Sequence, residues 1–251
     1  MKKNEPKRSR EIFPISVDRN IQLDSPVWSF SLEGLATEFD DHIKRSIPAY
    51  KETQDLIVDL SDYYTRQGGI IFDLGCSTGE LIKRLAEKNR HNNKNFWMGL
   101  DKEEGMILHS KNHTRDLPNL EFIHCDFLEY SLQKTPFVLI CYTLQFMTLA
   151  SRLVLLKKVF AALEEGGACV ISEKVLEENS STQNMFSSLY HQYKSRMRFN
   201  SSEILAKASS LTGILTPLTR QHNFKLFENA GFEKVTLLAK NLHFETYLLE
   251  K

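Results

Sequence analysis

The sequence predicts a doubly wound α/β domain built on a seven-stranded, mostly parallel sheet whose last strand runs antiparallel. Short apolar runs alternate with amphipathic helical segments from residue 70 to residue 172, a pattern typical of parallel strands joined by right-handed crossovers. Near the end of the chain, strands over 235–239 and 244–249 follow each other with almost no connection. Two strands joined by a tight turn cannot be parallel, so one of them reverses direction.

The remaining elements follow from apolar spacing. Continuous apolar runs predict five earlier strands, at 70–74, 96–100, 120–124, 137–143 and 168–172. Apolar residues at spacings of three and four predict helices within 28–50 and over 50–66, 79–88, 103–112, 149–163 and 220–230. Gly166 and Gly167 are expected to break the fifth of these helices, and Gly231 to end the last.

A chain of 251 residues can form one sizeable α/β core. Residues 1–27 begin with a basic stretch that no apolar segment follows, so we expect a flexible tail there and a single domain over 28–251. The polar segment 176–216 is too long for a simple connection. Its composition predicts a helical insertion that caps a ligand site at the carboxyl edge of the sheet.

Composition narrows the class of partner. Lys and Arg together number 32, as do Asp and Glu, so the overall charge does not indicate a nucleic-acid partner. A local basic patch on the surface remains an alternative. No run of about 18 apolar residues occurs, so we expect no membrane span. The four cysteines form no CxxC pair and have no His at metal-ligand spacing. We therefore expect no metal site, no disulfide and a reducing cytoplasm.

The main chemical signal lies between the first predicted strand and its helix, where the chain reads DLGCSTG from Asp73 to Gly79. Glycines at Gly75 and Gly79 let the backbone pass close to a ligand at the positive end of a helix. The spacing differs from the dinucleotide and phosphate-loop fingerprints, and no Lys-Ser/Thr pair follows. Backbone amides around Cys76 and Ser77 suit the amino-acid end of S-adenosylmethionine (SAM). This loop predicts SAM as the cofactor.

Polar and aromatic residues at the ends of later strands extend the predicted site. Asp101 ends the second strand, where a carboxylate can accept both ribose hydroxyls; a solvated loop Asp is the alternative. Asp126 ends the third strand and suits the adenine amino group, with Phe127 beside it to pack on the ring. Cys141 and Tyr142 end the fourth strand and face the same crevice.

Together these positions resemble the class I SAM-dependent methyltransferases. From Trp28 to Glu250 the chain is similar to one family, the carboxy-SAM synthases of bacterial wobble-uridine modification. The matching strings are KRSIPAY at 44–50, DLGCS at 73–77, TLQF at 143–146, ISEK at 171–174 and ENAGF at 228–232. The resemblance implies a homodimer, and it implies SAM contacts at Tyr50, Gly75, Cys76, Ser77, Asp101, Lys102, Asp126 and Phe127.

Two positions depart from that family. Cys141 stands where the family has an Asn, and Ala208 stands where it has an Arg that grips the extra carboxylate of carboxy-SAM. A charge-assisted contact of that kind supplies about 1.5–3 kcal/mol. Lys207 is adjacent, but on a helix it points about 100° away from Ala208. We therefore expect the protein to bind SAM at least as well as carboxy-SAM.

Several further side chains are candidates for contact with a second substrate. His191, in the insertion, is a candidate general base, with a solvent-facing role as the alternative. Tyr142 is a second catalytic candidate, and Glu173 lies near the same crevice. Arg196 and Arg198 could pair with an acidic substrate or could solvate a helix face.

The sequence thus favours a SAM-dependent methyltransferase that acts on a small-molecule acceptor and holds the reactants in a near-attack geometry. The alternative is a carboxy-SAM synthase, in which prephenate would donate a carboxyl group to SAM. A third hypothesis, a non-catalytic SAM-binding subunit, predicts a damaged cofactor motif, and Asp73–Gly79 is intact. We expect a cytoplasmic homodimer with no membrane or nucleic-acid partner.

Overall fold

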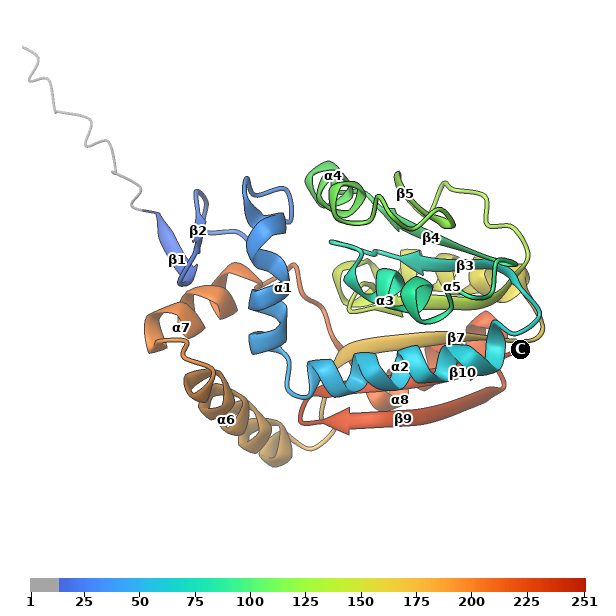
Figure 1. Cartoon of the computed structure of the whole chain (residues 1–251). Coiled ribbons are helices and arrows are strands. Elements are labelled where there is room, and N and C mark those ends of the chain that lie inside the picture. Colours follow the sequence, from blue (N-terminus) through green and yellow to red (C-terminus); the bar gives the residue numbers. More distant parts are fainter. Residues whose placement is uncertain (1–13) are drawn as a thin grey trace, which may run out of the picture.

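The computed structural model describes residues 14–251. Its main sheet has the spatial strand order β5-β4-β3-β6-β7-β10-β9, and the short β8 pairs with the end of β7 (Figure 1). The strands are β3 (Gly69–Leu74), β4 (Asn95–Asp101), β5 (Leu120–His124), β6 (Thr135–Cys141), β7 (Leu163–Leu176), β8 (Leu218–Thr219), β9 (Lys234–Asn241) and β10 (Phe244–Glu250).

One strand on this seven-strand path opposes the others. β3 to β7 pair in parallel with their neighbours, whereas β10 pairs antiparallel with both β7 and β9. β9 therefore runs in the common direction, and the last strand of the chain is the antiparallel one. This confirms the predicted fold class, with six parallel strands and an antiparallel seventh.

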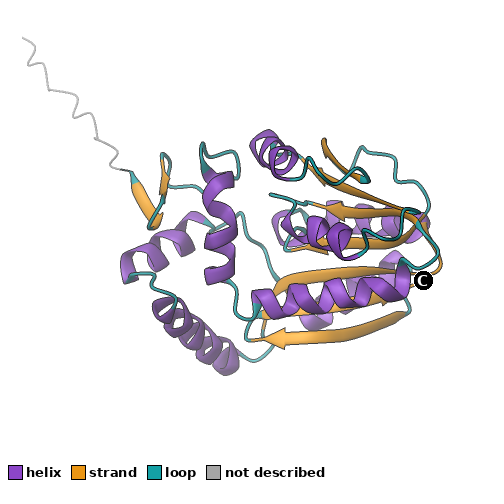
Figure 2. Cartoon of the chain, in the orientation of Figure 1, coloured by secondary structure: helices purple, strands orange, loops and turns teal. Residues whose placement is uncertain are grey.

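Helices cover both faces of the sheet (Figure 2). They are α2 (Tyr50–Tyr64), α3 (Glu80–Lys88) and α4 (Glu104–His113) on one face, and α5 (Leu149–Ala162) and α8 (Arg220–Ala230) on the other. Successive strand residues point to opposite faces, so Ile71 packs with the first group of helices and Phe72 with the second. Each face thus has its own apolar core.

A separate group of elements lies at one end of the sheet (Figure 1). It consists of β1 (Ile15–Asp18), β2 (Ile21–Leu23), α1 (Leu35–Ser46), α6 (Ser180–Arg196) and α7 (Ser201–Ser210). The last two helices lie in the segment 176–216 that was predicted to be helical. The prediction of a tail over 1–27 is wrong for 15–23, because Val17, Ile21 and Leu23 are buried in an antiparallel hairpin. Residues 1–13 of that predicted tail lie outside the described part of the chain.

Two boundaries differ from the prediction for identifiable reasons. β6 ends at Cys141 instead of residue 143, because Tyr142 takes a left-handed φ of 58° while its N–H donates to the Ser172 carbonyl at 2.6 Å. β7 begins at Leu163, ahead of the two glycines that were expected only to break a helix. At the end of α8, Gly231 adopts a φ of 111°, as expected for a glycine that terminates a helix.

Candidate functional site

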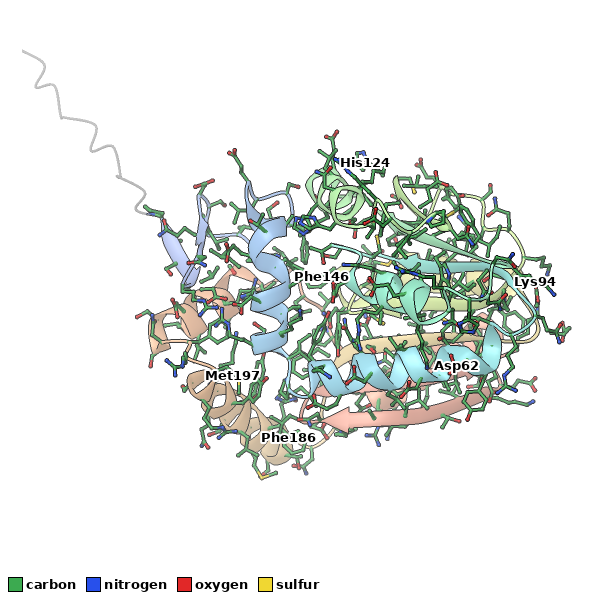
Figure 3. All side chains as sticks on the ribbon, viewed as in Figure 1. Asp62, Lys94, His124, Phe146, Phe186 and Met197 are labelled. Atoms are coloured by element: carbon green, nitrogen blue, oxygen red, sulfur yellow. The ribbon has the colours of Figure 1, made fainter. Side chains whose placement is uncertain are left out.

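A cavity of about 480 Å³ lies between the carboxyl ends of the parallel strands and the helices α1, α6 and α7. In this fold class, ligands bind at that edge of the sheet, where the strand order reverses between β3 and β6. Phe146 lies at the boundary between the sheet and α1, whereas Lys94 lies at the opposite end of the molecule (Figure 3). The cavity thus has one wall from the sheet and one from the helical group.

The loop after β3 approaches the cavity with its backbone. Gly75 has a φ of 82°, and a Cβ at this position would overlap the Thr143 side chain. The N–H groups of Gly75 and Cys76 both donate to the Leu100 carbonyl, at 2.8 and 3.1 Å. These amides are therefore engaged within the fold. The loop offers a ligand its close backbone approach and the Ser77 hydroxyl, which lies 3.5 Å from the sulfur of Met106 in the same cavity.

Asp101, at the end of β4, lines the cavity and is 8% exposed. One of its carboxylate oxygens accepts the N–H of Ser77 at 2.7 Å, and the other accepts the N–H of Glu103 at 3.0 Å. A carboxylate has about four acceptor positions, so two remain for a ligand. Burial raises the pKa of Asp101, and the two backbone donors oppose that shift. The carboxylate is thus fixed in place before any ligand arrives.

Asp126 and Phe127 line the cavity just beyond β5. One Asp126 oxygen accepts the N–H of Leu128 at 2.8 Å, and the exposed carboxylate keeps its second oxygen for a ligand. Phe127 is buried and belongs to the core beneath it. Lys102 also borders the cavity, but its side chain is 69% exposed. These positions can surround a purine ring on its edge and one face.

Cys141, Tyr142 and Tyr50 come together where β6 ends and α2 begins. The rings of Tyr50 and Tyr142 are 6.0 Å apart, and the Tyr50 hydroxyl accepts from Gln54 at 2.7 Å. Burial raises the pKa of the Cys141 thiol, so the thiol is neutral and offers no charge. The predicted site residues at the end of the fourth strand thus face the same cavity as the loop after β3.

Asp73, near the end of β3 and before the loop at Gly75, is buried and lines the cavity. Burial raises its pKa to about 8, and the nearby charge of Asp101 adds to the shift. Two carboxyl groups close together in a buried site favour a cation between them. SAM carries a sulfonium and an ammonium group, so its charge suits this part of the cavity.

Other predicted residues lie differently from expectation. Gly79 does not line the cavity; its φ of 75° begins α3, and a Cβ there would overlap Phe122. Glu173 is buried outside the cavity and accepts the N–H of Leu144 at 3.0 Å, so it supports the turn η1 (Leu144–Phe146). His191 borders the cavity as an exposed side chain.

Arg196 and Arg198 are exposed and do not line the cavity, so neither supplies a cation to it. Lys207 does line it and is buried, although we expected it to point away from the position of Ala208. Lys207 and Ala208 both border the cavity, although neighbouring positions on a helix point about 100° apart.

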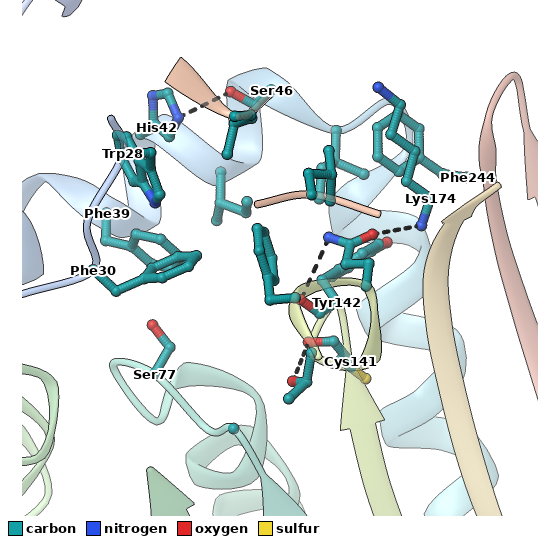
Figure 4. Close-up of a pocket in the computed structure, with 18 of the residues that line it drawn as sticks. Trp28, Phe30, Phe39, His42, Ser46, Ser77, Cys141, Tyr142, Lys174 and Phe244 are labelled. Carbon is teal, nitrogen blue, oxygen red and sulfur yellow. Dashed lines mark hydrogen bonds between the residues drawn. The ribbon is translucent and has the colours of Figure 1, made fainter. Parts of the chain in front are cut away.

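Sequence reasoning placed the insertion 176–216 over the ligand site but missed the residues that α1 contributes to this end of the cavity (Figure 4). His42 is 3% exposed; its Nδ1 lies 2.6 Å from Asp18, and Ser46 lies 3.4 Å from its Nε2. Burial lowers the pKa of His42 to about 4, with Asp18 opposing and Lys207 adding to the shift. The position of His42 three residues beyond Phe39, on the apolar face of α1, was the signal available in the sequence.

Within residues 14–251, no group of three or more His, Cys, Asp or Glu residues could hold a metal ion. No described helix is both long and apolar enough to cross a membrane.

Comparison with known proteins gives the family. The chain is 34% identical over 220 residues to the carboxy-S-adenosyl-L-methionine synthase of Nautilia profundicola. These residues cover 87% of this chain and 93% of that protein. It is 29% identical to the synthase of Campylobacter lari over 96% of this chain and 99% of that protein. The chain belongs to the carboxy-SAM synthase family. A family model for a methyltransferase domain also matches residues 66–231.

Solved structures agree on the fold. Human N-acetylserotonin methyltransferase in complex with SAM has a TM-score of 0.60 at 17% identity, over 88% of this chain and 57% of that one. Magnesium protoporphyrin IX methyltransferase of Synechocystis, with bound S-adenosylhomocysteine, has a TM-score of 0.57 at 13% identity, over 86% and 94%. The chain is a SAM-dependent transferase with the class I methyltransferase fold.

Proposed function

We propose that the chain makes carboxy-SAM by transferring a carboxyl group from a small carboxylate donor to the methyl carbon of SAM. The observation that carries this proposal concerns the two ends of one cavity. One end is bordered by the loop after β3, Gly75–Thr78, called the SAM loop below, and the other end is lined by three lysines, Lys174, Lys194 and Lys207. An anionic donor can therefore lie beside the SAM methyl group. The donor that the family resemblance suggests is prephenate.

In this proposal SAM is held by the residues at the strand ends. Asp101 accepts the ribose hydroxyls through its remaining lone pairs, and Asp126 accepts the adenine amino group while Phe127 packs on the ring. Asp73, which is buried and lines the same cavity, lies beside the methionine part. Tyr50 and Tyr142 border the methyl group and exclude water from it. A fixed, desolvated arrangement lets two reactants meet in a near-attack geometry.

The transfer replaces one methyl hydrogen of SAM by a carboxyl group. With prephenate as the donor, the bond between its ring and the ring carboxyl group breaks, and the electron pair of that bond makes the ring aromatic and expels the ring hydroxyl as hydroxide. Hydroxide takes the proton that leaves the methyl carbon, and the methyl carbon bonds to the released CO₂, so the products are carboxy-SAM, phenylpyruvate and water. Cationic neighbours favour this step, because they stabilise the negative charge of the entering carboxyl group. We give Tyr142 a positioning role here, since its raised pKa keeps the phenol protonated. The ring of His191 has no hydrogen-bond partner among residues 14–251, and no step of the proposed transfer involves it.

A second candidate is methyl transfer from SAM to an anionic small-molecule acceptor. Ala208 favours it, because it borders the cavity where the family resemblance implies an Arg for the carboxylate of carboxy-SAM. The two functions differ in product. Incubation of the protein with SAM and prephenate, followed by mass spectrometry, should yield a nucleoside heavier than SAM by one CO₂. Formation of S-adenosylhomocysteine alone with added acceptors would support methyl transfer instead.

We further propose a cytoplasmic homodimer that binds no nucleic acid directly. Four free cysteines support a reducing compartment, and equal numbers of basic and acidic residues support a non-nucleic-acid substrate. Exposed Leu56 and Leu237 support a dimer, as does the family resemblance. Light scattering after size-exclusion chromatography should give twice the chain mass of 29.0 kDa; a single chain mass at micromolar concentration would contradict the dimer.

A further inference from the structure

Two lysines occupy an unusual position at the helical end of the cavity. Lys194 on α6 and Lys207 on α7 are 5% and 8% exposed, and both line the cavity. Buried ammonium groups normally require a carboxylate partner, because the loss of hydration costs several kcal/mol. Among residues 14–251, no acidic oxygen lies within ion-pair distance of either Nζ, and neither Nζ has a hydrogen-bond acceptor.

Aromatic rings are the closest partners of these ammonium groups. The Nζ of Lys207 lies over the Trp28 ring, and the Nζ of Lys194 lies 4.7 Å from the centroid of Phe199 and 5.7 Å from that of Tyr190. Cation–π contacts offset part of the cost of burial. Burial nevertheless lowers the pKa of both lysines, to about 8 for Lys194. The charge of Lys174 adds to the shift of Lys194, and the charge of Lys194 adds to the shift of Lys207. The pair thus lacks an anion.

The acidic groups nearest to the pair already have other partners. Asp18 accepts two bonds from Arg45, at 2.6 and 2.7 Å, and lies 2.6 Å from His42. Glu203 accepts the N–H of Asn200 at 2.8 Å in the capping box of α7. Neither carboxylate can turn to the lysines without leaving a cation or a helix end unsatisfied. The positive charge at this end of the cavity is therefore directed at whatever enters it.

The walls beside the lysines are apolar and aromatic. Trp28, Phe30 and Phe39 form one wall, and the Phe30 ring meets that of Phe146 with 4.9 Å between centroids (Figure 4). Trp28 shares an apolar cluster with Met106, whose sulfur contacts Ser77 of the SAM loop. Trp28 thus belongs both to the surroundings of Lys207 and to the apolar cluster that borders the loop after β3.

We propose that Lys194 and Lys207 form a subsite for a carboxylate group whose apolar ring-bearing body lies against Trp28 and Phe30. The proposal rests on the proposed function for the presence of SAM in the same cavity. It assigns to Lys207 the task that the family resemblance gives to an Arg at the next position, Ala208. The carboxylate belongs either to the donor or to the carboxy-SAM product, and the experiment separates the two.

The test uses the full chain with Lys207→Met and Lys194→Met, because Met keeps the length and apolar stem of Lys. Titration calorimetry at pH 7 measures the binding of prephenate, carboxy-SAM and SAM. We expect each variant to bind at least one of the two carboxylate probes about 10- to 100-fold more weakly, with SAM binding unchanged within twofold. Arg196→Met, on the exposed face of α6, should leave all three affinities unchanged.

Loss of prephenate binding alone assigns the subsite to the donor, and loss of carboxy-SAM binding alone assigns it to the product. Thermal unfolding of the ligand-free variants provides an independent readout. Removal of an unpaired buried charge should raise the melting temperature, whereas removal of a structural lysine should lower it. Three results would overturn the proposal. Both variants could bind both probes with wild-type affinity, the unaltered protein could bind neither probe, or both variants could have a lowered melting temperature.

The outcomes also separate this subsite from the proposed function. If the unaltered protein binds prephenate through the two lysines and makes no carboxy-SAM, the subsite stands and the carboxyl transfer fails. If it makes carboxy-SAM while both Met variants bind the probes normally, the transfer stands and the subsite fails.

Discussion

Replacement of Asp101 by Asn tests the SAM site at its most constrained residue. The carboxylate is 8% exposed, and each oxygen already accepts one backbone N–H, from Ser77 or Glu103. Asn keeps the size of the side chain but removes the charge and turns one acceptor into a donor. The new NH₂ group of Asn would point either at a backbone N–H of the loop, which is also a donor, or at a ribose hydroxyl, which would then have to accept instead of donate.

The expected loss follows from the bonds that change. Two hydrogen bonds from ribose hydroxyls to an ionised acceptor contribute about 1.5–3 kcal/mol each, and Asn retains part of one of them. We therefore expect Asp101→Asn to weaken SAM binding by about 2–4 kcal/mol, or about 30- to 900-fold. Titration calorimetry at pH 7 measures this directly. Asp116→Asn, at an exposed position outside the cavity, is the matched control.

A collapsed loop would also weaken binding, so a second measurement is needed. The 2′-deoxy form of S-adenosylhomocysteine lacks one of the two hydroxyls, and its loss of affinity should be smaller in Asp101→Asn than in the unaltered protein, because both changes remove the same contact. SAM affinity within twofold of the unaltered protein would refute the reasoning, as would fully additive losses.

Three more outcomes are expected. Burial raises the pKa of Glu173 in the folded state to about 8 from an ordinary 4.5. The protonated side chain therefore contributes its full stability below pH 4.5, and this contribution is lost as the pH rises through 8. Glu173→Gln should flatten the decline of the unfolding free energy with pH, measured by denaturant unfolding, and an unchanged pH profile would contradict this. Gly75→Ala should lower stability by about 1–3 kcal/mol, because its Cβ would overlap Thr143 at a positive φ; an unchanged melting temperature argues against this. Hydrogen exchange in 176–216 should slow when SAM and a carboxylate probe bind together, and equal exchange in both states would show that this segment is not a cover.

Much of the fold could be predicted because its strands are short apolar runs. The segments 70–74, 96–100 and 120–124 are short apolar runs separated by helical segments, as expected for buried strands of a parallel sheet, and all three are strands in the structure. The residues that end them face the cavity for the same reason, since parallel strands bring their carboxyl ends to one edge. Local pattern and topology thus sufficed for the SAM half of the site.

The other half could not be predicted from local pattern. Lys194 and Lys207 lie in helices whose composition indicates a solvated surface. The Nζ of Lys207 nevertheless lies over the ring of Trp28, far along the chain, and β1 of the hairpin packs on α7. His42 occupies an apolar helix face, but its partner Asp18 lies on a segment that composition assigns to a tail. Such positions are decided by tertiary contacts that no window of sequence contains.

The hairpin β1–β2 has a consequence for the order in which the molecule forms. Ser16 on the hairpin bonds to Glu203 on α7 across 187 positions of sequence, and β1 packs on that helix. The SAM half, in contrast, comes from consecutive strand–helix units between residues 69 and 127. Contacts between distant segments carry the larger cost of loop closure and form later. The nucleoside end of the cavity should therefore form early in folding. The end lined by Lys194 and Lys207 should form only after nearly the whole chain has emerged from the ribosome.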